Sequence, residues 1–268
     1  MTDVHLDLEA VTRVYPGVAG RKPVHALGPI DLKLSRGEFF SVVGPSGCGK
    51  STLLEIVGGL QPLSEGSYTF EGLSINGQVP DGVGVVFQEN ACFPWMTVRD
   101  NIAFGLKMDR NPEADTRERT DYALKLMGLR DFAESYPAQL SGGMRQRVCI
   151  ARTLVMQPRL ILLDEPFGAL DQQTRLLMGD ELLRLWRETG ATVMLITHAL
   201  DEAALLSDRI AVMSARPGVF LDIVATGWPR ERDSALVEDP RLANISAGLW
   251  RHLRSESIKA MSSDKEAE

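Results

Sequence analysis

Residues 44–52 read Gly-Pro-Ser-Gly-Cys-Gly-Lys-Ser-Thr, and this segment constrains the fold more strongly than any other. It satisfies the pattern G-x-x-x-x-G-K-[ST], in which glycines let the backbone curl until its N–H groups point at phosphate oxygens. The pattern requires a strand before it and a helix after it. The apolar run 39–43 predicts that strand, and the apolar residues within 53–60 predict that helix. The segment therefore predicts a phosphate-binding loop.

Two side chains of this loop have separate expected tasks. We expect the Lys50 ammonium to reach the β- and γ-phosphates of a nucleotide and the Ser51 hydroxyl to coordinate Mg²⁺. A glycine-rich turn that contains lysine by chance is the alternative, and the flanking strand and helix disfavour it. The predicted nucleotide contacts of the loop are Gly44, Pro45, Ser46, Gly47, Cys48, Gly49, Lys50, Ser51 and Thr52.

Short, continuous apolar runs recur along the chain, as is typical of strands buried on both faces of a parallel sheet. These runs are residues 39–43, 83–87, 160–163, 192–196 and 210–213. Segments with helical periodicity, such as 174–188, lie between them. We therefore expect an α/β fold with a mostly parallel sheet.

The middle of the chain differs from its flanks, because 97–107, 112–127 and the segment after Ser141 all indicate helices. We expect residues 89–157 to form a helical subdomain inserted into one core, which would be built from 1–88 and 158–230. Beyond this 1–230 domain, residues 231–268 predict a short C-terminal helix, with 262–268 as a frayed polar end. The apolar face of that helix would carry Leu242, Ile245, Leu249 and Leu253.

Polar residues with catalytic potential follow three of the predicted strands. Asp164 and Glu165 end the run 160–163, where Asp164 is expected to hold Mg²⁺ and Glu165 to polarise an attacking water. His198 follows the run 192–196 and is a candidate contact for the γ-phosphate, although a lone histidine is more often structural. Gln88 closes the run 83–87, and its amide could contact Mg²⁺ or the water. By itself, Gln88 would be interpreted as a loop amide.

Residues 140–144, Leu-Ser-Gly-Gly-Met, indicate a second anion site. Ser141 is a good N-cap residue, and Gly142 and Gly143 leave backbone N–H groups exposed where a helix begins. The alternative is an ordinary capped helix with a basic face.

Composition excludes several classes of protein. The 268 residues carry 29 Lys and Arg against 36 Asp and Glu, a net charge of -7 that disfavours a broad nucleic-acid surface. The three cysteines are too few and too scattered for a disulfide framework or a zinc site, which fits a reducing compartment. Neither a secretory signal nor an apolar span is visible. We expect a cytoplasmic protein whose contact with a membrane is made through a partner.

Taken in order along the chain, these motifs resemble the ATP-binding cassette (ABC) ATPase family. The resemblance rests on Tyr15, the loop 44–52, Gln88, residues 140–144, Asp164-Glu165, residues 169–171 and His198. It implies a P-loop NTPase core with an antiparallel N-terminal β subdomain and an inserted helical subdomain. One departure is Met144, where the commonest family signature ends in glutamine.

The resemblance also implies partners and further nucleotide contacts. It implies a head-to-tail homodimer with two ATP molecules between the chains, in which Ser141 and Gly143 face the nucleotide held by the other chain's Lys50. Tyr15 would stack on adenine, unless it is only a surface residue of a turn, and Asp171 would lie across the dimer seam. ATP and Mg²⁺ are the implied ligands.

Residues 94–101, 163–170 and 212–218 are similar to those of nitrate, sulfonate and taurine import ATPases. This similarity implies an energy-coupling subunit of an importer for a small anion or organic compound. Such a subunit lies peripherally on the cytoplasmic face of the inner membrane, bound to transmembrane permease subunits and served by an extracytoplasmic substrate-binding protein. Within 89–101, Phe93 and Trp95 are predicted to be exposed and to suit a permease helix, with packing inside the helical subdomain as the alternative.

Two other classes of function remain to be weighed. A soluble ABC ATPase that remodels DNA or ribosomes is the main alternative, but the long coiled-coil insertion or second cassette of such proteins is absent from the sequence. A P-loop kinase or GTPase is disfavoured by the intact signature at 140–144 and by the lack of an N-K-x-D segment.

Overall fold

The computed structural model describes residues 4–17, 22–89 and 91–265. Its larger sheet has six strands in the order β10-β9-β3-β8-β7-β6, and every neighbouring pair is parallel except β10 with β9. The predicted α/β fold with a mostly parallel sheet is confirmed, and each predicted apolar run contains a strand. The strands are β3 (Phe39–Val43), β6 (Val83–Val86), β7 (Leu160–Asp164), β8 (Thr192–Ile196), β9 (Arg209–Met213) and β10 (Phe220–Ala225).

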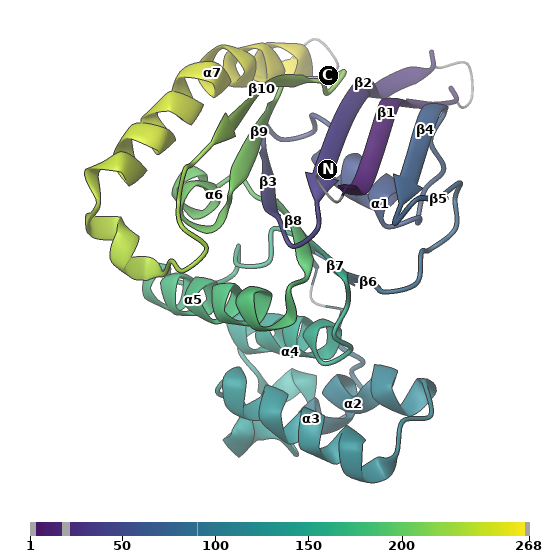
Figure 1. Ribbon diagram of the computed structural model, residues 1–268, viewed down its shortest axis with the longest axis vertical. Coiled ribbons are helices and arrows are strands. Elements are labelled where there is room, and N and C mark those ends of the chain that lie inside the picture. The colour runs from purple at the N-terminus through teal and green to yellow at the C-terminus, as the bar shows by residue number, and fades with distance from the viewer. Residues whose placement is uncertain (1–3, 18–21, 90, 266–268) are drawn as a thin grey trace.

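A smaller, antiparallel sheet lies beside the larger one (Figure 1). It has four strands in the order β2-β1-β4-β5, which confirms the antiparallel N-terminal β subdomain. Helix α1 (Lys50–Val57) contributes Leu53 and Leu54 to a core that this sheet shares with the larger sheet. The strands are β1 (Val4–Tyr15), β2 (Val24–Ser35), β4 (Glu65–Phe70) and β5 (Leu73–Ser74).

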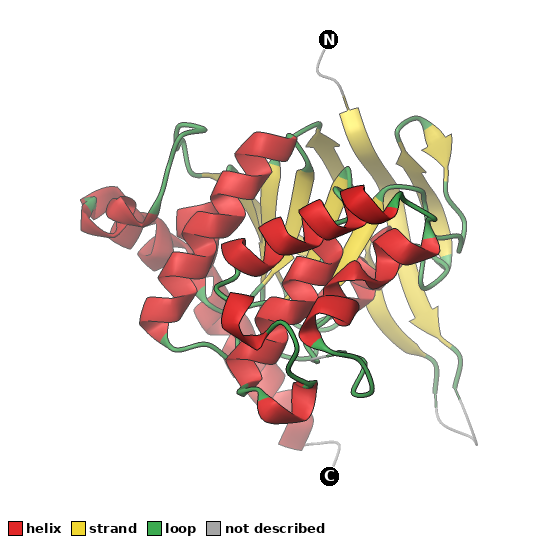
Figure 2. Ribbon diagram, turned by 90° about the horizontal axis from the view of Figure 1, so that it is seen from below, coloured by secondary structure: helices red, strands yellow, loops and turns green. Residues whose placement is uncertain are grey.

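Strand β7 shows why the central strands are apolar throughout. Leu160 and Leu162 lie in the core shared with α1 and the smaller sheet, whereas Ile161 and Leu163 lie in a second core among the helices. Successive side chains of a strand point to opposite faces, so a strand covered on both faces needs apolar residues at every position. Figure 2 shows helices gathered over the strands on one side of the molecule.

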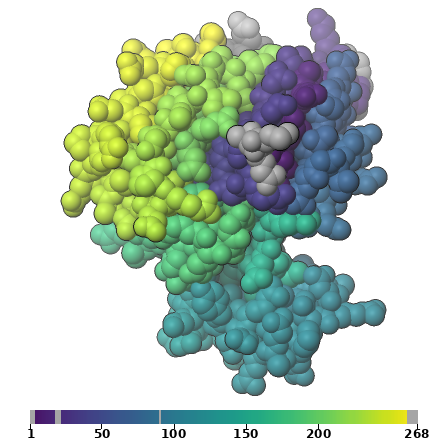
Figure 3. Space-filling model, viewed as in Figure 1, coloured from purple at the N-terminus to yellow at the C-terminus, as the bar shows by residue number. Residues whose placement is uncertain are grey.

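Helices α2 (Val98–Met108), α3 (Glu113–Leu126) and α4 (Gly142–Leu154) form the inserted helical subdomain. They lie together at one end of the molecule, and the space-filling view shows this part set off from the rest (Figures 1 and 3). The Thr97 side chain accepts a hydrogen bond from the Asp100 N–H and caps α2, which explains why the helix begins there.

The remaining helices are α5 (Gln172–Thr189), α6 (Leu200–Leu206) and α7 (Pro240–Lys265). Helix α7 has 26 residues, so the prediction of a short C-terminal helix is wrong in length. The helix also continues through 262–265, a segment expected to be frayed. Adding a residue to an existing helix is easier than starting one, so helical backbone can extend from the buried part of α7 into a polar stretch. Leu242, Leu249 and Leu253 are buried, as their spacing predicts. Within the described residues, no helix combines the length and apolarity needed to cross a bilayer.

Candidate functional site

The parallel strands bring the predicted site residues to one edge of the larger sheet. Strands β3, β8, β7 and β6 are neighbours in that order, so the segments after their carboxyl ends meet. These segments are the loop 44–49 after β3, Thr197-His198 after β8, Asp164-Glu165 at the end of β7, and Gln88 after β6. Residues up to 154 positions apart in the sequence become neighbours for this reason.

The loop 44–49 curls as its glycines predict. Gly47 and Gly49 adopt φ angles of 70° and 110°, in the left-handed region that favours glycine. A Cβ atom at Gly49 would lie 2.7 Å from the Ala26 carbonyl oxygen, so a larger residue would collide with the backbone of β2. Lys50 Nζ donates to the carbonyl oxygens of Gly44 and Pro45, each at 2.9 Å, which holds the ammonium within the curl of the loop.

Asp164 and Ser51 offer oxygen atoms that fit a magnesium ion. Asp164 is 7% exposed, and its Oδ1 atom is buried without a hydrogen-bond partner. Burial raises the pKa of this carboxyl, while a hydrogen bond with Ser51 and the charge of Lys50 act in the opposite direction. An unpaired buried carboxylate oxygen beside a hydroxyl is costly unless a cation or proton donor satisfies it. Oxygen ligands are those that Mg²⁺ prefers, so these residues fit the ion.

The described residues contain no group of three or more His, Cys, Asp or Glu side chains placed to hold a metal. A magnesium ion at Asp164 and Ser51 would therefore need further oxygen ligands from water and from nucleotide phosphates, as is usual for this ion.

Glu165 joins two other predicted site residues. Its Oε2 atom accepts a hydrogen bond from Gln88 Nε2 at 3.1 Å and lies 3.1 Å from His198 Nδ1. The backbone of Glu165 has a φ angle of 46°, which is uncommon for a residue other than glycine, and its N–H is fixed by the Ile196 carbonyl at 2.8 Å. The strained backbone aims the carboxylate between β6 and β8. The three side chains thus form one network, although each comes from a different strand end.

Tyr15 lies beside the same loop. Its hydroxyl is 3.5 Å from Thr52 Oγ1, and the guanidinium of Arg13 lies 4.7 Å from the centre of its ring. These contacts place an aromatic ring beside the first turn of α1, and the stacking of Tyr15 on adenine stays a prediction.

The predicted second anion site lies elsewhere on the chain. The Ser141 side chain accepts a hydrogen bond from Met144 N and caps α4, and the Asp171 side chain accepts from Thr174 N and caps α5. A Cβ atom at Gly143 would lie 2.7 Å from the side chain of Leu170, so the start of α4 packs closely against the loop that precedes α5. Among the described residues, no hydrogen bond or ion pair joins Ser141, Gly142, Gly143 or Asp171 to the loop 44–52.

A family model described as ABC transporter matches residues 27–168. The chain belongs to the ABC transporter family. The nitrate import ATP-binding protein NrtD of Synechocystis is 39% identical over 97% of this chain and 100% of its own length. The taurine import ATP-binding protein TauB of Roseobacter denitrificans is 50% identical over 73% of this chain and 72% of its own length.

Solved structures agree with this assignment. A dimeric ATP-binding cassette in a post-hydrolysis state with ADP and phosphate is similar to this chain, with a TM-score of 0.75 and 32% identity. The similarity covers 84% of this chain and 100% of that one. The chain is accordingly an ATP-binding and ATP-hydrolysing protein of the ABC type.

The phosphate loop of this ABC ATPase has a support that the sequence did not indicate. Arg216 Nε and Nη2 donate to the Gly47 carbonyl oxygen at 3.2 and 3.0 Å, and a Cβ atom at Gly218 would lie 2.2 Å from the Cys48 carbonyl oxygen. The loop 214–218, which carries both residues, is itself held by Glu256 of α7, whose Oε2 atom accepts from Ala215 N at 3.0 Å. In the sequence, residues 212–218 indicate only a family resemblance, because no local pattern reveals that they contact the phosphate loop.

Glu202 is a second residue that sequence reasoning missed. It is 9% exposed on α6, and its Oε1 atom has no hydrogen-bond partner. Burial raises its pKa to about 7, although the charge of Arg175 and a hydrogen bond with Thr197 act in the opposite direction. The charge of Glu165 contributes to the increase, so Glu202 lies within electrostatic reach of the hydrolysis site. A glutamate in the first turn of a helix gives no signal of burial in the sequence.

Phe93 and Trp95, which are both predicted to be exposed, differ in their exposure to solvent. Trp95 is 70% exposed, as predicted. The prediction is wrong for Phe93, which is half-buried among Phe104, Arg152 and Trp95. The helical subdomain supplies these neighbours, so the alternative of packing inside that subdomain holds for Phe93.

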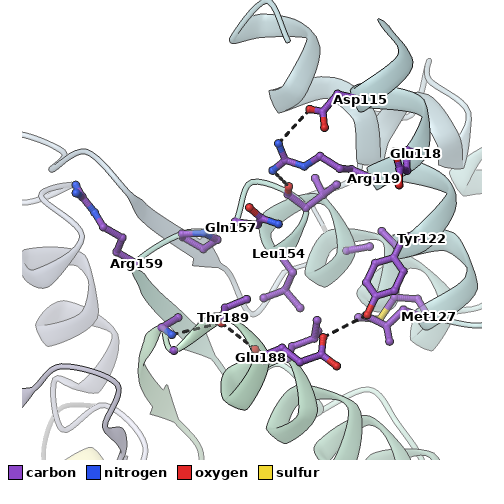
Figure 4. A pocket seen from close by; sticks show the side chains of 18 of the residues that line it. Asp115, Glu118, Arg119, Tyr122, Met127, Leu154, Gln157, Arg159, Glu188 and Thr189 are labelled. Atoms are coloured by element: carbon purple, nitrogen blue, oxygen red, sulfur yellow. Dashed lines mark hydrogen bonds and ion pairs between the residues drawn. The ribbon is translucent and has the colours of Figure 1, made fainter. Parts of the chain in front are cut away.

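A cleft of about 870 Å³ separates α3 from the core (Figure 4). Tyr122 on α3 reaches across it and its hydroxyl donates to Glu188 on α5 at 3.3 Å. The cleft is lined by 157–159 and 189–191, which precede β7 and β8. It therefore lies at the opposite end of these strands from the phosphate loop and contains none of that loop's residues.

Proposed function

We propose that Lys50, Asp164, Glu165, Gln88 and His198 form the hydrolysis centre of this ABC ATPase. Lys50 would bind the β- and γ-phosphates, and Glu165 would orient the attacking water and accept its proton. Gln88 and His198 would hold the Glu165 carboxylate and contact the γ-phosphate side of the nucleotide. The observation that supports this proposal is the hydrogen-bonded network around Glu165 at the edge that also carries the phosphate loop.

Mg²⁺ would be held by Ser51 and Asp164, with Gln88 nearby. When bound, the ion neutralises charge that develops on the phosphate oxygens. The unpaired Oδ1 atom of Asp164 supports this role.

A second proposal concerns the active assembly, which would be a head-to-tail homodimer. Ser141 is exposed at the start of α4 and has no contact with its own phosphate loop, so it is free to face a nucleotide held by another copy. Gly142 and Gly143 would present N–H groups to that nucleotide, and Asp171 would lie at the seam. The dimeric cassette that is similar to this chain supports the arrangement.

We further propose that the dimer is the energy-coupling subunit of a multi-subunit importer. The names of the relatives, which refer to nitrate and taurine import, support a small anion or organic compound as cargo and favour import over remodelling of DNA or ribosomes. The ATPase would bind transmembrane permease subunits at the cytoplasmic face of the inner membrane. An extracytoplasmic substrate-binding protein would deliver the cargo.

Within the ATPase subunit, residues 1–88 and 158–230 would form the core, and residues 89–157 would form the helical subdomain.

Replacement of Glu165 by Gln tests the hydrolysis centre and the dimer together. The amide cannot accept the proton of water, so we expect turnover to fall by about 10²-fold or more, while ATP binding is retained. Phosphate release measures turnover, and size-exclusion chromatography at saturating ATP should show accumulated dimers. Wild-type turnover by the variant, or a variant that remains monomeric with ATP bound, would contradict the proposal.

Replacement of Trp95 by Ala tests permease docking. Trp95 is 70% exposed and its removal opens no buried cavity, so ATP binding should be unchanged. Co-purification with the permease subunits should fall, since an exposed tryptophan is a common anchor of protein interfaces. Replacement of exposed Tyr122 by Ala, on α3 of the helical subdomain, is the matched control. Equal co-purification of both variants with the permease would remove Trp95 from the interface.

A further inference from the structure

Two of the three cysteines face each other where the chain enters the helical subdomain. The Sγ atoms of Cys92 and Cys149 are 3.5 Å apart, although 57 positions separate the residues in the sequence. Cys92 belongs to the segment that follows Gln88, and Cys149 lies within α4. A disulfide has an S–S length of about 2.05 Å, so its formation requires an approach of only about 1.5 Å.

The surroundings of the pair give its members different properties. The hydrogen bond with Cys92 and the nearby charge of Arg152 lower the pKa of the Cys149 thiol. The pKa of the Cys92 thiol is raised, first by this hydrogen bond, in which either thiol can be the donor, and then by partial burial. Arg152 is fixed beside the pair, since its Nη1 atom donates to the Ala91 carbonyl at 2.8 Å. The charge of Arg152 favours the thiolate form of either member of the pair.

Cys48 in the phosphate loop provides a contrast. It is 1% exposed, and burial raises the pKa of its thiol. Among the described residues, its side chain accepts a hydrogen bond from the Lys50 ammonium at 3.8 Å and makes none with either of the other thiols. Cys48 thus lacks both the thiolate character and the second thiol that disulfide formation needs.

We propose that Cys92 and Cys149 are a site of reversible oxidation, at which a peroxide converts the two thiols into a disulfide that lowers ATP turnover. The inferred effect on turnover rests on the hydrolysis centre proposed above, whereas the disulfide itself does not. Cys92 is half-exposed and gives the pair access to solvent, whereas Cys149 is buried behind it.

The chemistry proceeds in two steps. The thiolate of one member of the pair attacks one oxygen of hydrogen peroxide, so an S–O bond forms, the O–O bond breaks and hydroxide leaves to become water with the thiol proton. The sulfur of the other member then attacks the sulfenic sulfur and loses its proton, so the S–S bond forms and the S–O bond breaks with release of a second water. Two thiols and one peroxide thus give one disulfide and two waters.

The disulfide would join two parts that serve the hydrolysis site. Gln88, four residues before Cys92, donates to Glu165, and α4 begins with the Ser141 cap that the proposed dimer requires. A covalent link between the segment after Gln88 and α4 fixes their separation. Any rearrangement of the helical subdomain that must move one relative to the other during turnover is then blocked.

The test uses the purified full-length protein with and without hydrogen peroxide. Alkylation of the remaining thiols, proteolysis and mass spectrometry should find a peptide that links Cys92 to Cys149 within one chain, with Cys48 still alkylated. ATP turnover should fall by about an order of magnitude in the oxidised protein and return after dithiothreitol. Absence of the linked peptide, or links found only between chains, would overturn the proposal.

Cys92→Ala and Cys149→Ala are the matched variants, each compared with its own untreated activity. Both retain Cys48, so both should resist peroxide if the pair is responsible for the inhibition. If peroxide inhibits either variant as strongly as it inhibits the wild type, the pair is not responsible and another group accounts for the inhibition. A linked peptide without loss of turnover would reject the regulatory role. Failure of the proposed hydrolysis centre would show separately, as wild-type turnover in untreated Glu165→Gln.

Discussion

At the scale of single residues, the backbone of Glu165 explains why the hydrolysis network assembles. Its φ angle of 46° is unfavourable for a side chain with a Cβ atom, by about 1 kcal/mol or more. The hydrogen bond from its N–H to Ile196 and the contacts of its carboxylate with Gln88 and His198 hold it in this conformation. This conformation directs the carboxylate along the edge of the sheet that also carries the loop 44–49.

Glu202 yields a prediction about stability and pH. Burial raises its pKa to about 7 in the folded chain, above its ordinary value of 4.5, so the folded state holds a proton that the unfolded state releases. Its contribution to stability is fully present below pH 4.5 and is lost as the pH rises through about 7. The loss amounts to about 3 kcal/mol in the free energy of unfolding.

Replacement of Glu202 by Gln removes this titration while keeping the shape of the side chain. We expect the variant to unfold at a higher urea concentration than the wild type at pH 8 and at a similar concentration near pH 5. Urea unfolding at both pH values measures the difference. Replacement of the exposed Asp201 by Asn is the neighbouring control, for which no such pH-dependent gain is expected. A Glu202→Gln gain of the same size at both pH values would mean that the carboxyl does not titrate between them.

At the scale of elements, helix α7 supports the phosphate loop through the loop 214–218. Glu256 of α7 accepts the Ala215 N–H, and Arg216 donates twice to the Gly47 carbonyl. Ser214 stiffens the loop further, because its hydroxyl donates to the Pro217 carbonyl and accepts from Val219 N, each at 3.0 Å. A helix near the end of the sequence thereby helps to set the backbone that surrounds the phosphates.

Loss of this support should weaken ATP binding more than the chemical step. We expect Arg216→Ala to raise KM for ATP by about three- to tenfold with a smaller change in kcat, because the removed contacts are made to the loop and not to the attacking water. Glu256→Gln should also raise KM for ATP, but by a smaller factor than Arg216→Ala. Steady-state kinetics measures both values.

Lys259→Gln is the matched control on α7, since it removes the ion pair with Glu256 Oε1 but leaves the contact of Glu256 with Ala215 in place. Its KM should be close to that of the wild type. A fall in kcat with unchanged KM in Arg216→Ala would place Arg216 in the chemical step instead of in support of the loop.

At the scale of the whole molecule, one chain holds the phosphate loop and Ser141 in different parts of the fold. The phosphate loop follows β3, whereas Ser141 caps α4 in the helical subdomain, and no described contact joins them. In the proposed head-to-tail dimer, each nucleotide would lie between the phosphate loop of one copy and Ser141 of the other.

Complementation between two inactive variants tests this division. Lys50→Ala removes the phosphate contact of one half-site, and Ser141→Arg places a bulky cation in the other. Each variant alone should be inactive, but an equal mixture should recover up to about a quarter of wild-type turnover, because half of the dimers are mixed and each has one intact site. Phosphate release over a range of protein concentrations measures the recovery. Two variants that remain inactive when mixed would argue against a shared site.

Motifs whose chemistry depends on adjacent residues could be predicted from the sequence. The loop 44–52, the strand that ends in Asp164-Glu165 and the cap at Ser141 all depend on local spacing, because a curl, a strand end or a helix start involves only neighbours in the chain. The family resemblance predicted the antiparallel subdomain, which is confirmed, and the roles of Tyr15 and Asp171, which stay predictions. The length of α7 was missed because helical persistence in a polar stretch has no strong periodic signal.

The sequence by itself determined that this chain has a phosphate loop, a mostly parallel sheet and an ordered set of ABC motifs. Only the tertiary structure decided that Glu165 holds Gln88 and His198, that Arg216 fixes Gly47, and that Cys92 meets Cys149. The physical reason is that local spacing governs backbone conformation, whereas contacts between distant residues depend on strand order and on which surfaces become buried together.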